Sequence, residues 1–125
     1  MKLRAVASIL LLALAPAAFA GKGPDPVPAK GATPGKWTQD YDAALAVAKE
    51  HGLPVMLKFT GSDWCGWCKL MEANVFTTKE FANWADGRVM LVTIDFPRFS
   101  DTVPKEYKDR NERLASENGI GGFPT

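Results

Sequence analysis

Two cysteines, Cys65 and Cys68, are the residues of this chain whose type and spacing most directly indicate chemistry. They stand in the run WCGWCK at residues 64–69, and the 125 residues contain no other cysteine. Two intervening residues let the two sulfur atoms meet across one helical turn. The Cys-x-x-Cys spacing therefore predicts a redox pair whose disulfide opens and closes with little backbone movement.

The same spacing serves other chemistries, which the rest of the chain makes less suitable. A structural zinc site needs about four Cys or His ligands, and His51 is the only further candidate here. Covalent haem attachment requires a His directly after the second cysteine, where Lys69 stands. A purely structural disulfide remains the plainer alternative, although its loop is too short to restrain the unfolded chain much.

The first twenty residues have the composition of a signal peptide. Lys2 and Arg4 form a basic start, residues 5–14 are apolar, and Ala18-Phe19-Ala20 fits a small-x-small cleavage site. The apolar stretch is short for a transmembrane helix. We therefore predict cleavage after Ala20, location in the periplasm or outside the cell, and no stable membrane insertion afterwards. Disulfides persist in such compartments.

The mature chain divides into a linker and one small domain. Residues 21–36 are rich in Gly, Pro, Ala and Lys, with four prolines and almost no apolar bulk, which predicts a disordered linker. The domain is expected at residues 37–125. The formal net charge of the whole sequence is +1, and loss of Lys2 and Arg4 with the signal peptide leaves −1. Such a balance argues against nucleic acid as a partner.

Apolar periodicity and turn residues outline the elements of this domain. Two apolar strands with helix between them imply a parallel βαβ unit. The predicted order is a helix over 38–51 capped by Thr38, a strand over 54–60, a helix from the cysteines to about residue 76, a short helix through residue 85 opened by a Thr77–Glu80 capping box, a strand over 88–95, and a helix from Pro104 to Gly119.

This order, with Trp-Cys-Gly-x-Cys after the first strand and Gly-Ile-x-Gly-Phe-Pro-Thr at residues 119–125, resembles the thioredoxin family over residues 37–125. The resemblance implies a thioredoxin-like α/β fold and a thiol–disulfide oxidoreductase that reduces or isomerises disulfides. Its implied partners are exported proteins with thiols or disulfides, and an unidentified thiol–disulfide electron donor or acceptor. It implies no metal and no cofactor besides the Cys65–Cys68 couple.

The resemblance also assigns roles to residues of the two motifs. Cys65 matches the attacking cysteine of the family and Cys68 matches its resolving cysteine. Pro124 matches the cis-proline that lies against the disulfide, with Phe123 and Thr125 presenting backbone to an incoming peptide. We also expect Cys65 to be the more accessible and more acidic of the two thiols, because it lies at a helix start.

Supporting positions show where the chain departs from thioredoxin itself. Trp64 matches the aromatic residue beside the pair. The dipeptide Gly66-Trp67 is neither the Gly-Pro of thioredoxin nor the Gly-His of disulfide isomerases, so the direction of the redox reaction does not carry over. Lys58 stands where thioredoxin has a buried acid, and as a neutral amine it could serve as a base.

The family continues beyond its cis-proline with two antiparallel strands and a closing helix. Here the sequence stops at Thr125, so the resemblance implies an incomplete fold: the N-terminal βαβα portion, with the C-terminal strand pair and helix missing. The strand over 54–60 would then lie at an edge of the sheet. Two other functions stay open at this point: a thioredoxin-like binding module without enzymatic activity, and an inactive gene fragment.

Overall fold

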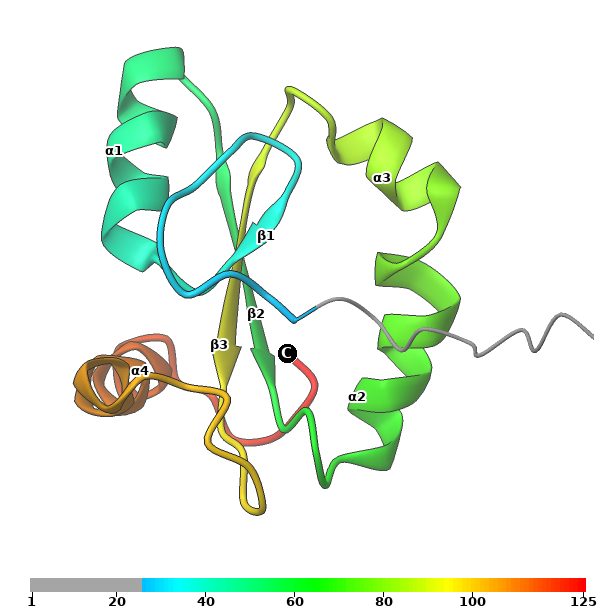
Figure 1. Cartoon of the computed structure of the whole chain (residues 1–125), viewed down its shortest axis with the longest axis vertical. Coiled ribbons are helices and arrows are strands. Elements are labelled where there is room, and N and C mark those ends of the chain that lie inside the picture. Colours follow the sequence, from blue (N-terminus) through cyan, green and yellow to red (C-terminus); the bar gives the residue numbers. More distant parts are fainter. Residues whose placement is uncertain (1–25) are drawn as a thin grey trace, which may run out of the picture.

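A three-stranded parallel sheet forms the centre of the computed structural model, which describes residues 26–125 (Figure 1). The predicted signal peptide and residues 21–25 lie outside the described residues. The strands are β1 (Trp37–Thr38), β2 (Val55–Thr60) and β3 (Met90–Asp95), in the order β1-β3-β2. In the register of β2 and β3, Lys58 lies opposite Thr93 and Thr60 opposite Asp95.

Helices cover both faces of this sheet. They are α1 (Tyr41–His51), α2 (Gly66–Met71), the π-helical turn η1 (Glu72–Phe76), α3 (Lys79–Ala85) and α4 (Lys105–Glu117). Figure 1 shows α1 and α4 on one side of the sheet, and α2, η1 and α3 on the other. The parallel α/β arrangement predicted from the two apolar strands is confirmed, with β1 as an additional edge strand.

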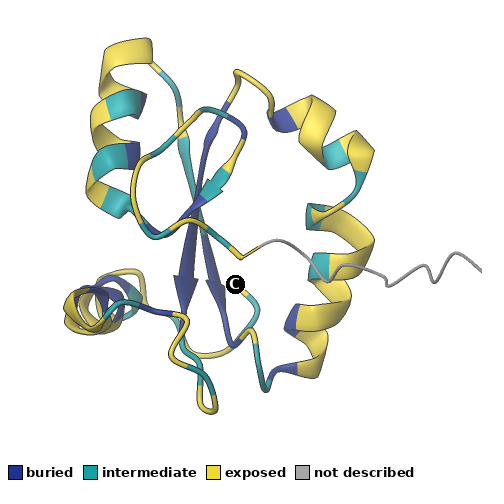
Figure 2. Cartoon of the chain, in the orientation of Figure 1, coloured by how far each residue is buried: buried dark blue, intermediate teal, exposed yellow. Residues whose placement is uncertain are grey.

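Successive side chains of β3 point to opposite faces of the sheet, which divides the hydrophobic core into two clusters. All six residues of this strand are buried (Figure 2), as expected for a central parallel strand. Met90, Val92 and Ile94 pack in a cluster with α1 and with Leu114 of α4. Leu91 packs on the opposite face in a smaller cluster with Ala85 of α3.

The face toward α2 and α3 changes character along the strands. Met56 and Leu91 pack in the apolar cluster beside α3. Farther along the same two strands, every second position is instead polar and buried: Lys58, Thr60, Thr93 and Asp95. The carboxyl ends of parallel strands meet at one edge of the sheet, and this arrangement therefore concentrates polar groups beneath the start of α2.

Two helices begin at residues other than the predicted ones. Thr38 lies in β1, and its hydroxyl donates to the Gly31 carbonyl at 2.6 Å. The first helix is capped by Asp40, whose side chain accepts from the Ala43 N–H. The cap of α3 is Thr78, not Thr77. The hydrogen-bond partner that each threonine finds in the folded chain decides which residue caps the helix. The sequence does not reveal that partner.

The linker prediction is wrong for residues 26–36, which lie against the domain. The Gly35 N–H donates to the Val89 carbonyl at 2.8 Å, and the Tyr107 hydroxyl donates to the Ala29 carbonyl at 2.8 Å. The Gln39 N–H donates to the Pro28 carbonyl at 2.8 Å. A proline-rich segment has little apolar bulk, but its carbonyl groups accept hydrogen bonds, and these hold it in place.

Candidate functional site

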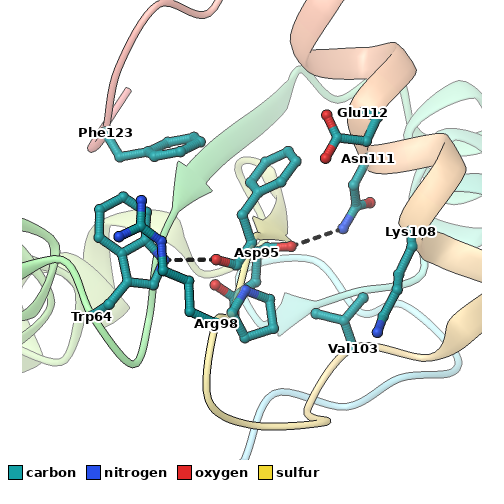
Figure 3. Close-up of a pocket in the computed structure, with 10 residues that line it drawn as sticks. Trp64, Asp95, Arg98, Val103, Lys108, Asn111, Glu112 and Phe123 are labelled. Carbon is teal, nitrogen blue, oxygen red and sulfur yellow. Dashed lines mark hydrogen bonds between the residues drawn. The ribbon is translucent and has the colours of Figure 1, made fainter.

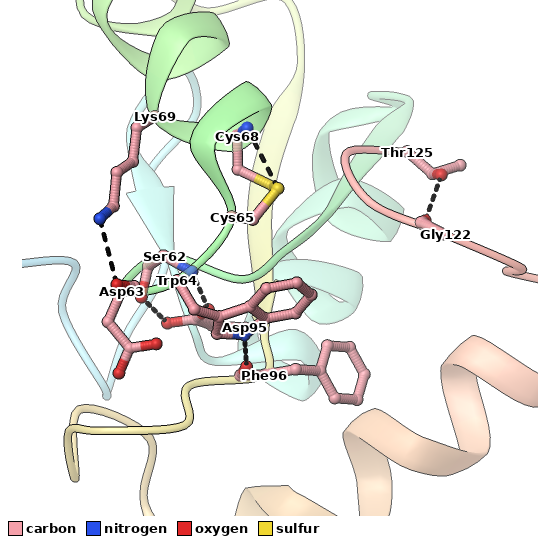
Figure 4. Close-up of a disulfide and its surroundings, with 10 residues drawn as sticks. All are labelled: Ser62, Asp63, Trp64, Cys65, Cys68, Lys69, Asp95, Phe96, Gly122 and Thr125. Carbon is pink, nitrogen blue, oxygen red and sulfur yellow. Dashed lines mark hydrogen bonds between the residues drawn. A yellow bond between two sulfur atoms is a disulfide. The ribbon is translucent and has the colours of Figure 1, made fainter.

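Cys65 and Cys68 form a disulfide at the start of α2 (Figure 4). Their Cα atoms are 5.2 Å apart, within the range that a disulfide spans. Cys65 is the N-cap of the helix, and its sulfur accepts a hydrogen bond from the Cys68 N–H at 3.2 Å. The geometry therefore gives the Cys65 sulfur a hydrogen-bond donor that would stabilise a thiolate after reduction.

Cys65 is not appreciably more exposed than Cys68, contrary to the expectation from the sequence. Cys65 is 6% exposed and Cys68 is 5% exposed, so both are buried in the disulfide form. The residues between them face solvent, with Gly66 exposed and Trp67 75% exposed. The difference between the cysteines thus lies in their hydrogen bonding, because Cys65 caps the helix whereas Cys68 belongs to its first turn.

Trp64 is fixed beside the disulfide by three different contacts. Its indole N–H donates to the Phe96 carbonyl at 2.8 Å. The Arg98 guanidinium lies over the indole ring at 3.6 Å, and the Phe123 ring meets it edge-on at 5.9 Å between centroids. Its position also requires Gly61, because a Cβ there would overlap the indole. Trp64 therefore joins the cysteine turn, the Phe96–Arg98 segment and the proline motif.

The Phe123–Pro124 peptide bond is cis, as the family resemblance implies. Phe123 packs against Phe96 as well as Trp64. Thr125 exchanges backbone hydrogen bonds with Phe59 of β2, at 2.8 and 3.1 Å. Its N–H is therefore already used within the sheet, and a role for Thr125 in pairing with an incoming peptide is not supported. Phe123, whose ring flanks Trp64, is the better placed of the two.

An ion pair between the buried Lys58 and the partly exposed Glu72 lies behind the disulfide. The Lys58 ammonium is 2.6 Å from the Glu72 carboxylate and lies over the Trp37 ring at 4.0 Å. Glu72 follows Cys68 by one helical turn, and its N–H donates to the Cys68 carbonyl. The side chains of Cys68 and Glu72 therefore project from the same face of the helix. Burial lowers the pKa of Lys58, and the hydrogen bond and charge of Glu72 partly oppose this shift.

A cavity of about 770 Å³ connects this pair with Cys68. Its lining includes Cys68, Lys58 and Glu72. It also includes Thr93, whose buried hydroxyl has no hydrogen-bond partner within the described residues. Through this cavity, solvent can approach Cys68 past the polar side chains of the lining.

Carboxylates fix the loops on either side of the disulfide. Asp95 accepts hydrogen bonds from the Ser62 N–H at 2.9 Å and from the Ser62 hydroxyl at 2.5 Å. Asp63 accepts from the N–H groups of Arg98 and Phe99 at 3.0 and 2.8 Å. Burial tends to raise the pKa of Asp63, but these backbone hydrogen bonds and one from a serine hydroxyl outweigh it and lower the pKa.

Sequence reasoning found the cysteines, Trp64 and the proline motif, but it missed the supporting contacts. The sequence indicated no supporting contact for Asp63 or Arg98. The available signal was local: an acid directly before Trp-Cys and an arginine after Phe-Pro in an irregular segment. Their meeting depends on a contact across 35 residues, which no sequence pattern encodes.

Residues 26–125 contain neither a candidate membrane-spanning helix nor a candidate metal-binding cluster. No helix in that range is both long and apolar enough to cross a bilayer. No group of three or more His, Cys, Asp or Glu side chains in the same range could hold a metal ion.

Comparison with known proteins gives a consistent family. A thioredoxin-like family model matches residues 36–124. The disulfide bond reductase DsbH of Chlamydia pneumoniae is 35% identical over 86 residues, which cover 69% of this chain and 51% of the relative. The thioredoxin-related protein DsbJ of the same organism is 31% identical over 88 residues, covering 70% and 25%.

A solved structure extends the agreement to three dimensions. The structure of a DsbH oxidoreductase superposes with a TM-score of 0.66 at 30% identity, covering 94% of this chain and 72% of that chain. The chain spans about half the length of the curated DsbH and a quarter of DsbJ. The family model, the shared sequence and the shared fold together show that this chain belongs to the thioredoxin-like family.

Proposed function

We propose that this chain is an exported thiol–disulfide oxidoreductase that reduces or isomerises disulfides in exported proteins through the Cys65/Cys68 couple. The observation that carries the proposal is the disulfide itself, placed at a helix start with the Cys65 sulfur accepting the Cys68 N–H. The names of the relatives, a disulfide bond reductase among them, support the same class of reaction. Removal of residues 1–20 would accompany export.

In the reduced chain, the Cys65 thiolate attacks one sulfur of a substrate disulfide. A bond forms between Cys65 and that sulfur, and the other substrate sulfur leaves as a thiolate. The Cys68 thiolate then attacks the Cys65 sulfur, which closes the internal disulfide and releases the second substrate thiolate. Two electrons pass to the substrate, and a dithiol donor must return them before the next cycle.

The neighbouring residues support these steps in distinct ways. The Cys68 N–H stabilises charge on the Cys65 sulfur. The Lys58–Glu72 pair lines the cavity that reaches Cys68, and is placed to exchange a proton with the resolving thiol through that cavity. Trp67 and Phe99, 75% and 81% exposed, offer apolar surface near the disulfide to an unfolded substrate.

Reduction of a model disulfide tests the proposal directly. With dithiothreitol as electron donor, the full chain should accelerate reduction of insulin, and the Cys65→Ser variant should lose that acceleration. Ser116→Ala on the exposed part of α4 serves as the matched control and should retain it. Unchanged activity in Cys65→Ser, or none in the unaltered chain, would favour a thioredoxin-like binding module instead.

Export is tested separately from chemistry. In a bacterial host, the protein should be recovered from the periplasm or the medium, and N-terminal sequencing should begin at Gly21. Recovery of the full sequence from the cytoplasm would contradict the location proposed here while leaving the redox chemistry to its own test.

A further inference from the structure

A hollow of about 340 Å³ lies between the Trp64–Phe123 contact and α4 (Figure 3). Trp64 precedes the first cysteine and Phe123 precedes the cis-proline, so this hollow adjoins both motifs of the candidate active site. Its far wall comes from α4 through Lys108, Asn111 and Glu112. A peptide held between the two motifs would thus lie next to this hollow.

The inner wall of the hollow is aromatic. Phe123 stacks on Phe96 at 5.1 Å between centroids and meets the edge of Trp64 at 5.9 Å. Pro97 and the buried Val103 extend this apolar surface. Such a wall favours an aromatic or large aliphatic group, because apolar contact is the main source of affinity in pockets of this kind.

Charges of both signs line this hollow: the cations Arg98 and Lys108, the exposed carboxylate of Glu112, and the buried carboxylate of Asp95, which accepts from Ser62. Arg98 is exposed, and its guanidinium lies over the Trp64 ring, 3.6 Å from the ring centroid. It has no carboxylate within ion-pair distance among residues 26–125. Lys108 is half exposed and reaches Asp101 only at 4.0 Å. A guanidinium held over an aromatic ring presents N–H groups to an incoming carboxylate.

Hydrogen bonds hold the walls in place before any ligand arrives. Asp63 accepts from the Arg98 N–H, and Trp64 donates to the Phe96 carbonyl. On the α4 side, the buried Asn111 amide donates to the Asp95 carbonyl at 3.1 Å. Because these groups are already ordered, binding would cost little additional conformational entropy.

We infer that this hollow is a substrate side-chain pocket that selects an aromatic or large aliphatic residue close to the target cysteine, with a neighbouring carboxylate bound by Arg98. The volume lies at the lower end of the range for ligand pockets, which suits one side chain. The inference rests on the proposed function, since it names the peptide class that the redox site prefers.

Peptide mixed disulfides test the selectivity. One-cysteine peptides are joined to 2-mercaptoethanol and carry Phe-Asp, Ala-Asp or Phe-Asn two residues before or after the cysteine. Of the two Phe-Asp peptides, one with the dipeptide before the cysteine and one after it, the faster substrate is compared with the Ala-Asp peptide of the same order. We expect the full chain to reduce this Phe-Asp peptide with about tenfold higher kcat/KM. A smaller preference for Phe-Asp over Phe-Asn should come from Arg98.

Three variants assign the preference to the pocket. Glu112→Trp on exposed α4 narrows the entrance and should bring the Phe/Ala ratio close to one. Arg98→Glu should reverse the preference for Asp over Asn. Arg88→Glu makes the same charge change in the turn before β3, at the opposite end of that strand, and should keep both ratios of the unaltered chain.

Equal reduction of Phe-Asp and Ala-Asp peptides by the unaltered chain would overturn the inference, as would unchanged ratios in both pocket variants. If no peptide is reduced, the proposed function fails, and the inferred selectivity of the pocket is tested by peptide binding alone. Cysteine-to-serine peptides are then titrated against the oxidised protein while the Trp64 indole N–H is followed by NMR. Tighter binding of the Phe-Asp peptide supports the pocket, and equal affinities refute it.

Discussion

At the residue scale, the two cysteines are distinguished by their hydrogen bonds and hardly at all by their exposure. Both are buried, but only Cys65 caps α2 and accepts the Cys68 N–H. A donor 3.2 Å from the Cys65 sulfur favours negative charge on that sulfur after the disulfide is reduced. This difference supports the proposed roles of Cys65 as the attacking thiol and Cys68 as the resolving thiol.

This division predicts different trapping by the two serine variants. Cys68→Ser should accumulate mixed disulfides with exported proteins, because the second thiol that releases the substrate is absent. Cys65→Ser should accumulate few. Non-reducing gels of both variants, run beside a Cys65→Ser/Cys68→Ser control, measure the difference. Equal trapping by the two single variants would refute the assignment of nucleophile and resolving thiol.

Lys58 is the second residue whose state depends on its surroundings. Burial lowers its pKa below the ordinary value of 10.5, while Glu72 acts in the opposite direction. A lowered lysine pKa means that the unfolded chain binds the proton more strongly than the folded chain. Stability therefore rises with pH between the folded-state pKa and 10.5, where the unfolded lysine also becomes neutral.

Glu72→Gln should destabilise the chain at neutral pH, because it leaves the buried Lys58 ammonium without its counter-ion. The partial exposure of Glu72 limits the expected loss to about 1–3 kcal/mol. The difference from the unaltered chain should narrow as the pH approaches 10.5. Urea unfolding at pH 7 and pH 10 measures it, with Glu50→Gln on exposed α1 as the control. A loss independent of pH would show that the ion pair is not its cause.

At the scale of elements, the turn between β2 and α2 positions the chemistry. The Cys65 N–H donates to the Gly61 carbonyl at 2.9 Å, which brings the chain back from the strand into the helix. Trp64 folds over this turn so closely that position 61 has no room for a side chain. The turn therefore fixes the disulfide and the Trp64 wall of the side-chain pocket together.

Gly61→Ala should displace the Trp64 indole and break its hydrogen bond to the Phe96 carbonyl. Overpacking of this kind typically costs about 1–3 kcal/mol. Gly66→Ala is the matched control, since a Cβ at that position meets open space. Tryptophan NMR and urea unfolding of the two variants test this. Similar indole shifts and similar stability in both variants would contradict the tight contact at Gly61.

Among the elements of the fold, the two long strands could be predicted from the sequence and the short strand β1 could not. The strands around residues 55–60 and 90–95 were found because continuous apolar runs bounded by turn residues are typical of buried strands. β1 was missed because two residues carry no periodicity, and its pairing is set by β3. The cysteine motif and cis-proline were readable, whereas Arg98 and Asp63 meet only through tertiary folding.

At the scale of the whole molecule, residues 26–36 connect parts of the domain that are distant in sequence. Gly35 donates to the end of the turn before β3, and Tyr107 of α4 donates to Ala29. Gln39 bridges Val27 and Thr102 through its side-chain amide. The segment thus ties the sheet, α4 and the loop after β3 into one body, although its composition is that of a linker.

Removal of this segment should therefore reduce stability. We expect residues 37–125 to unfold at lower urea than residues 26–125, with a loss of about 2–4 kcal/mol from several hydrogen bonds of about 1 kcal/mol each. Tyr107→Phe, which removes one of them, should lose about 1 kcal/mol. A chain with an equal-length Gly/Ser segment in place of residues 26–36 separates these contacts from the effect of length. The stability of this Gly/Ser chain should resemble that of residues 37–125, because the Ala29 and Gly35 contacts depend on the native backbone path. If all four chains unfold at the same urea concentration, residues 26–36 form the dispensable linker that their composition first predicted.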